Sequence, residues 1–92
     1  MIASIRHRGL KRLYERGDAS GIRPDLVATV ERILTILDAA NIPQALDLPR
    51  HHLHPLKGDR KGFWAVTVRA NWRIIFRFES GNAADVELID YH

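Results

Sequence analysis

Apolar residues recur every three or four positions in the first part of the chain, which is the spacing of helices with one buried face. The clearest stretch covers residues 25–40, and Pro24 stands where the first turn of that helix is expected. Residues 7–16 repeat the spacing more briefly, and Gly17 is a natural end for a helix. The pattern therefore predicts a short helix followed by a longer one.

The spacing of the apolar residues changes to two after Gly62. Alternation over residues 64–69 and again over 72–78, with a tight connection between them, predicts a β-hairpin. A Ser-Gly-Asn turn at 80–82 and the residues from 84 to 89 predict a further strand of the same meander. The alternation directs the aromatic side chains of the hairpin into the core: Trp64, Trp72, Phe76 and Phe78.

The remaining segments are less regular. Residues 2–6 are β-prone and predict an opening strand, whereas residues 43–62 contain three prolines and predict only one helical turn, near 44–48. The fold class is therefore α+β, with two N-terminal helices packed on an antiparallel sheet of three or four strands. We expect the long helix to cover one sheet face, and Arg73 and Arg77 to project from the other as a phosphate-binding surface.

Composition narrows the class of protein. A chain of 92 residues, 46% of them hydrophobic, suits a single domain over residues 1–92 and excludes multidomain enzymes and doubly wound nucleotide-binding folds. The absence of cysteine excludes disulfides and thiolate zinc sites. No stretch has the apolar length of a signal peptide or a membrane span, so we expect a cytoplasmic protein that does not contact membranes.

The net charge of +3 is unevenly distributed along the chain. Residues 6–16 contain five basic residues and one glutamate, and residues 49–77 contain seven basic residues and one aspartate. Most of the basic residues are arginines, whose planar guanidinium groups suit phosphate. The distribution points to RNA or DNA before a membrane surface. On charge alone, a solvated basic face that favours solubility explains it equally well.

Three segments carry a family resemblance: residues 53–60 (LHPLKGDR), 68–74 (VRANWRI) and 89–92 (IDYH). In this order and spacing the chain resembles the HigB branch of the RelE-like toxins of bacterial toxin–antitoxin modules. The resemblance implies a microbial-RNase-type fold and a ribosome-dependent endoribonuclease that cleaves mRNA in the ribosomal A site. The implied partners are the ribosome, mRNA and a HigA-type helix-turn-helix antitoxin, through which operator DNA is bound indirectly. No cofactor is implied.

Cleavage of RNA without a metal requires a base for the 2′-hydroxyl, an acid for the leaving 5′-oxygen and positive charge at the phosphate. The resemblance assigns the scissile phosphate to Arg73, proton transfer or positioning to Asp90 and His92, and base stacking to Tyr91. Taken without the resemblance, Arg73 is an ordinary surface arginine and the last three residues are a terminus that frays.

The basic segment before the hairpin supplies further candidates. His54 is the second acid/base group, and Lys57 contacts phosphate or activates the base, although solvated side chains explain these two equally well. Arg60 and Arg69 are expected to bind RNA. A set on the first predicted helix is expected to dock on ribosomal RNA in a salt-dependent manner: Arg6, Arg8, Lys11 and Arg12.

Two alternatives remain open. His51, His52 and His54 do not match a known zinc spacing, so we expect no metal site and expect His51 and His52 to be exposed loop residues. The same basic sheet also suits a non-enzymatic RNA- or ribosome-binding module, or a co-repressor subunit with degenerate catalysis. A binding module needs no proton-transfer groups, so loss of residues 90–92 distinguishes it from a nuclease.

Overall fold

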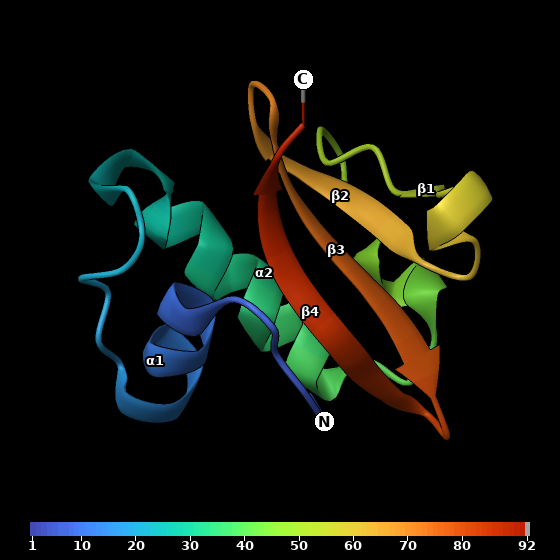
Figure 1. Ribbon diagram of the computed structural model, residues 1–92, viewed down its shortest axis with the longest axis horizontal. Helices are drawn as coiled ribbons and strands as arrows, with labels where there is room; N and C mark the ends of the chain where they lie inside the picture. Colours follow the sequence, from blue (N-terminus) through green and yellow to red (C-terminus); the bar gives the residue numbers. More distant parts are fainter. Residues whose placement is uncertain (92) are drawn as a thin grey trace.

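The computed structural model describes residues 1–91 and places two α-helices before a four-stranded antiparallel sheet, an α+β arrangement (Figure 1). The helices are α1 (Arg8–Arg16) and α2 (Val27–Ala39), both within a residue or two of the predicted ranges. The strands lie side by side in chain order: β1 (His54–Pro55), β2 (Trp64–Arg69), β3 (Trp72–Glu79) and β4 (Asn82–Asp90). Short 3-10 turns complete the chain: η1 (Pro24–Leu26), η2 (Pro43–Leu46) and η3 (Gly58–Arg60). No helix over residues 1–91 is long and apolar enough to cross a membrane.

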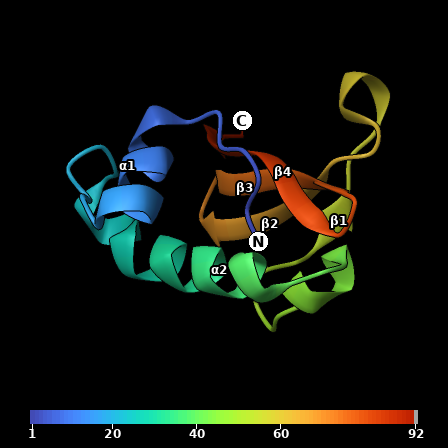
Figure 2. The ribbon, with the colours of Figure 1, turned by 90° about the horizontal axis from the view of Figure 1, so that it is seen from below.

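One hydrophobic core joins the helices to the sheet. Helix α2 runs along one face of the sheet, while η3 and the end of β4 lie towards the other (Figure 2). Phe76 of β3 is completely buried in this core and meets Phe78 edge-on, with ring centroids 5.9 Å apart. Trp64 and Trp72 pack against the same cluster while remaining half-buried. The prediction that the aromatic row belongs to the core is confirmed.

The N-terminal segment extends the sheet beyond β4. Ile2 and Ile5 form isolated parallel bridges with Ala83 and Val86, so the predicted opening strand exists as two contacts rather than as a continuous strand. The backbone N–H of Ile2 also donates to Asp38 Oδ1 at 3.0 Å, at the end of α2. The segment therefore ties the sheet edge to the long helix.

Strand β1 was not predicted, because residues 43–62 were expected to be irregular. His54 pairs with Ala65 and Pro55 with Trp64, at the edge of the sheet. An edge strand tolerates proline, since the missing N–H faces no neighbouring strand. The predicted helical turn in this region is present as η2.

Helix α1 approaches the following loop through a backbone contact at Gly9. A Cβ atom at this position would lie 2.4 Å from the carbonyl oxygen of Gly21. We therefore expect Gly9→Ala to lower the free energy of unfolding by about 1–3 kcal/mol, although alanine is the better helix former. Urea denaturation measures this, with the exposed Lys11→Ala as the control in the same helix. A gain in stability for Gly9→Ala would contradict the close contact.

Helix α1 begins at His7, whose Nδ1 accepts a hydrogen bond from the Leu10 N–H at 3.1 Å. Burial lowers the pKa of His7 and outweighs the opposing effect of Glu87. The unfolded chain therefore binds a proton on His7 more readily than the folded chain does. This contribution to stability is complete above the unfolded pKa of about 6.5 and is lost as the pH falls towards the lowered folded pKa.

The variant His7→Asn tests this coupling, because asparagine keeps an N-cap acceptor and does not titrate. We expect the wild-type protein to lose more stability than His7→Asn when urea denaturation is repeated at about pH 5.5 instead of about pH 7.5. Equal losses in the two proteins would show that His7 makes no contribution to the pH dependence.

Candidate active site

The register of the sheet places His54 and Arg73 on the same face. Arg73 on β3 lies opposite Thr67 on β2 and Ile89 on β4, while His54 on β1 lies opposite Ala65. Directly opposed residues share a face, and this one is turned away from α2; we call it the outer face. His54 and Arg73 are two strands apart across the sheet and two residues apart along it, which separates their Cα atoms by about 12 Å. Two of the residues predicted to act in RNA cleavage therefore share one surface.

The outer face continues into a cavity of about 530 Å³ between η3 and the end of β4. Lys57 and Arg60 line it from the η3 side, and Asp90 and Tyr91 line it from the β4 side. These four residues were predicted from separate sequence segments, and the structure brings them together. Asp59 and Ile89 complete the lining, and a cavity with two cations, two carboxylates and an aromatic ring can hold a nucleotide by its phosphate and its base.

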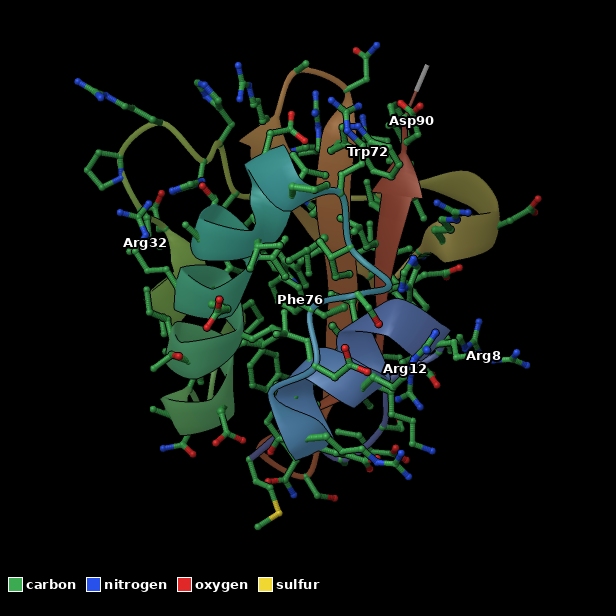
Figure 3. All side chains as sticks on the ribbon, turned by 90° about the vertical axis from the view of Figure 1, so that its left-hand side faces the viewer. Arg8, Arg12, Arg32, Trp72, Phe76 and Asp90 are labelled. Atoms are coloured by element: carbon green, nitrogen blue, oxygen red, sulfur yellow. The ribbon has the colours of Figure 1, made fainter. Side chains whose placement is uncertain are left out.

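The end of β4 is anchored to the β2–β3 turn. Asp90 pairs with Trp72, and the Tyr91 N–H donates to the Asn71 carbonyl at 2.7 Å. Figure 3 shows Trp72 and Asp90 at the same end of the sheet. The tail is therefore fixed up to Tyr91, whose side chain keeps 52% exposure and offers its ring for stacking. His92, the other tail residue predicted to transfer protons, lies outside the described residues.

Arg73 is oriented by the turn that precedes it. Its Nη1 donates to the carbonyl oxygens of Ala70, at 2.6 Å, and Trp72, at 3.3 Å. Within residues 1–91, no carboxylate pairs with this guanidinium, and its Nε and Nη2 make no hydrogen bond. Arg73 is thus held at one nitrogen while its other donors can bind an anion.

Arg69 lies apart from the cavity of Lys57 and Arg60. It lines a neighbouring cavity of about 260 Å³ and pairs with Asp25, with 3.6 Å between Nη1 and Oδ2. Arg23 also pairs with Asp25, at 2.8 Å, and holds the pKa of this carboxyl below its usual range. Asp90 lines both cavities, so it marks the boundary between them.

Arg77 projects from the same face as Arg73, as the alternation predicts, but ion pairs occupy its guanidinium, so it is not a free phosphate-binding group. Its Nε donates to Asp85 Oδ2 at 2.7 Å and its Nη2 to Glu79 at 3.2 Å. Arg6 also pairs with Asp85, with 3.3 Å between Nε and Oδ1. The pKa of Asp85 is lowered mainly by the hydrogen bond from Arg77. The register shift beside Arg77 adds one residue to β4, between Ala84 and Glu87, and leaves the alternation of β3 intact.

The basic residues predicted to dock on ribosomal RNA do not all present free charges. Arg6 is exposed but pairs with Asp85. Arg8 and Lys11 are exposed on α1, with Arg8 pointing away from the core (Figure 3). Arg12 is half-buried, and its Nε is buried without a hydrogen-bond partner in the described part of the chain. Arg8 and Lys11 are therefore the members best placed to meet a polyanion.

His51 was predicted to be an exposed loop residue, and this prediction was wrong. Its side chain is 6% exposed and connects α2 to β2, with Arg32 at Nε2 and the Thr67 carbonyl at Nδ1. The local sequence contains no signal for this, because both partners lie more than fifteen residues away. His52 is exposed, as predicted. Among the described residues, no group of three or more His, Cys, Asp and Glu could hold a metal ion.

Comparison with known proteins identifies the family of the chain. A family model described as "RelE-like toxin of type II toxin-antitoxin system HigB" matches residues 3–92. A protein of Proteus vulgaris named "Endoribonuclease HigB" is 46% identical over 92 residues, which cover the full length of both chains. The chain therefore belongs to the HigB-like family of RelE-like toxins of type II toxin–antitoxin systems.

Proposed function

We propose that this protein is the endoribonuclease toxin of a type II toxin–antitoxin module and that it cleaves mRNA in the ribosomal A site. The observation that carries the proposal is the cavity in which Lys57 and Arg60 face Asp90 and Tyr91, beside the outer face that bears His54 and Arg73. The full-length relative named Endoribonuclease HigB supports the same activity. We assign the chain to the RelE-like, microbial-RNase-type fold, as a single domain with its two N-terminal helices on the sheet.

The proposed reaction needs no metal, because the RNA supplies its own nucleophile. A base removes the proton of the 2′-hydroxyl, and the oxygen attacks the adjacent phosphorus. The bond from phosphorus to the 5′-oxygen breaks, and an acid protonates this leaving group. The products are a 2′,3′-cyclic phosphate and a 5′-hydroxyl. Histidine suits both proton transfers near neutral pH.

The residues divide these tasks by their positions. His54 serves as the base, since its Nδ1 is bound to the His52 carbonyl at 2.8 Å and its Nε2 is left to accept a proton. The tail residues Asp90 and His92 serve the leaving group. Arg73 binds the scissile phosphate, where negative charge increases in the transition state. Lys57 and Arg60 hold neighbouring phosphates, and Tyr91 stacks on a base of the codon.

The open shape of this site supports dependence on the ribosome. His54 and Arg73 stand on the outer face, whereas Asp90 pairs with Trp72 of the other face and lines the wide cavity at the end of the sheet. Such an open arrangement does little to orient a flexible RNA strand. The ribosome holds the A-site codon in a fixed conformation and supplies that orientation. Basic residues of α1, chiefly Arg8 and Lys11, attract ribosomal RNA. We assign neutralisation to a HigA-type helix-turn-helix antitoxin, through which the complex binds operator DNA.

Primer extension on a defined mRNA, incubated with purified protein and with or without ribosomes, tests the proposal. We expect cuts within codons only in the presence of ribosomes. Equal cutting of naked RNA would support the proposed cleavage reaction but overturn its dependence on the ribosome. Absence of cuts from a folded, ribosome-bound protein would favour the non-enzymatic binding module or the co-repressor subunit.

A further inference from the structure

The loop that leads into β1 has an unfavourable backbone conformation. Arg50 and His52 have φ angles of 72° and 50°, in the left-handed region that residues other than glycine seldom adopt. Such a conformation is unfavourable for these residue types and persists only when the surroundings impose it. The contacts of His51, which lies between the two, therefore have to hold this loop in place.

His51 binds Thr67 of β2 through both its backbone and its side chain. The Thr67 N–H donates to the His51 carbonyl at 2.7 Å, and the Thr67 carbonyl accepts from His51 Nδ1, also at 2.7 Å. Thr67 is the residue directly opposite Arg73. The loop is thus fastened to the strand next to the proposed phosphate-binding arginine.

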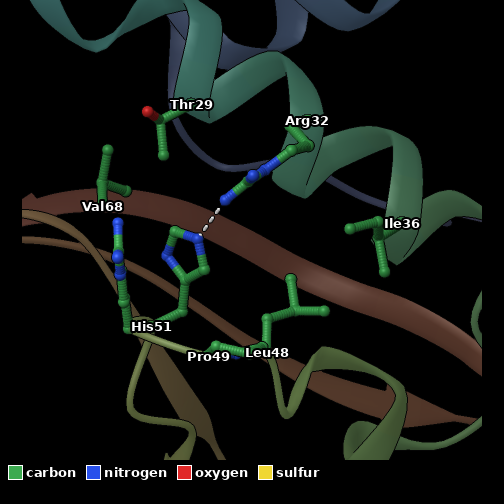
Figure 4. A pocket seen from close by; sticks show the side chains of 8 residues that line it. Thr29, Arg32, Ile36, Leu48, Pro49, His51 and Val68 are labelled. Carbon is green, nitrogen blue, oxygen red and sulfur yellow. Dashed lines mark hydrogen bonds between the residues drawn. The ribbon is translucent and has the colours of Figure 1, made fainter.

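Arg32 on α2 secures the other edge of the His51 ring. Its guanidinium donates to His51 Nε2, across a groove of about 490 Å³ between α2 and the loop (Figure 4). Arg32 can only donate, so Nε2 must be the acceptor and Nδ1 must carry the proton that goes to Thr67. The two partners of His51 therefore select one defined tautomer of its ring.

The clamped loop presents one carbonyl group to His54. The oxygen of His52 lies 2.8 Å from His54 Nδ1, and a carbonyl can only accept, so His54 carries its proton on Nδ1. Its Nε2 then has the free lone pair that a base requires. The orientation of the His52 carbonyl depends on the left-handed φ of this residue, and hence on the bonds that His51 makes to Thr67.

We propose that His51 is a positioning residue that sets the tautomer and orientation of His54 through the His52 carbonyl. The consequence for catalysis rests on the proposed function, in which His54 is the base. The expected effect of His51 on the tautomer and orientation of the His54 ring does not rest on the proposed function. The two parts can therefore be tested separately.

The first test is nuclear magnetic resonance of the ring nitrogens of His54 at a pH where the ring is neutral. His51→Phe keeps the bulk of the ring and removes both of its side-chain hydrogen bonds. We expect the His54 signals to move towards the Nε2–H tautomer in this variant. His51→Asn places an amide donor near the position that His51 Nδ1 occupies in the wild-type protein. This variant should restore the signals of the Nδ1–H tautomer of His54. His52→Asn is the matched control, because asparagine tolerates a positive φ and His52 is exposed.

The second test is single-turnover cleavage of ribosome-bound mRNA. We expect His51→Phe to lower the rate about tenfold with ribosome affinity unchanged, and to lower it no further when His54 is already alanine. Additive losses in the double variant, or an unchanged His54 tautomer in a folded His51→Phe protein, would overturn the inference. If the wild-type protein does not cleave at all, the proposed function fails, and the ring-nitrogen measurement still decides the role of His51.

Discussion

Arg73→Ala is expected to reduce the rate of mRNA cleavage on the ribosome by about 10²–10³-fold, the usual loss when one group that stabilises transition-state charge is removed. Arg73 is held at Nη1 by the Ala70 carbonyl, so its remaining donors meet the phosphate without reorganisation. Binding to the ribosome should change little, because most of the attraction comes from other basic residues. Single-turnover primer extension measures the rate, and co-sedimentation with ribosomes measures binding.

Two variants make this result specific. Arg73→Lys keeps the charge but loses the planar fork, and we expect intermediate activity. Arg16→Ala removes an exposed arginine at the end of α1, away from the outer face, and should cleave at the wild-type rate. If a folded Arg73→Ala protein cleaves at a rate within about threefold of the wild-type rate, Arg73 takes no part in the reaction. The phosphate contact would then be assigned to Lys57 or Arg60.

The helices and the central strands could be predicted from the sequence because their patterns are local. Residues 27–39 repeat apolar positions at the helical period, and residues 64–69 and 72–79 alternate, so each pattern specifies its own conformation. Strand β1 has only two residues, one of them proline, and no period can be measured over two positions. Its existence depends on pairing with β2, which is a tertiary contact.

The candidate site was predictable in its residue types but not in its geometry. The family resemblance named Lys57 and Tyr91, yet no spacing along the chain indicates that residues 34 positions apart line one cavity. Regular alternation along β3 places Arg77 on the outer face, but it does not indicate that this arginine is ion-paired there. The extra residue of β4 lies at Asp85 and Val86, and Asp85, with its positive φ, meets the Arg77 guanidinium. Sequence alternation does not reveal such a shift.

Removal of residues 90–92 is expected to abolish cleavage while leaving ribosome binding intact. The truncation takes away Asp90, Tyr91 and His92, and loss of acid/base groups alone costs about 10²–10⁴-fold in rate. Loss of the stacking ring costs a further 1–3 kcal/mol or so of base binding. Arg8, Lys11 and Lys57 remain, so the electrostatic attraction to ribosomal RNA persists. The same pair of assays, primer extension and co-sedimentation, separates the two activities.

The truncated protein must be shown to fold, since the Tyr91 N–H binds the Asn71 carbonyl and its loss frees the end of β4. Full-length variants therefore accompany it. Tyr91→Phe keeps the ring and should retain most of the activity, whereas Tyr91→Ala should lose about 5–150-fold through stacking alone. A folded protein without residues 90–92 that still cleaves ribosome-bound mRNA at a tenth of the wild-type rate would exclude the tail from proton transfer. In that case both transfers would have to be made by His54 and its neighbours on the outer face.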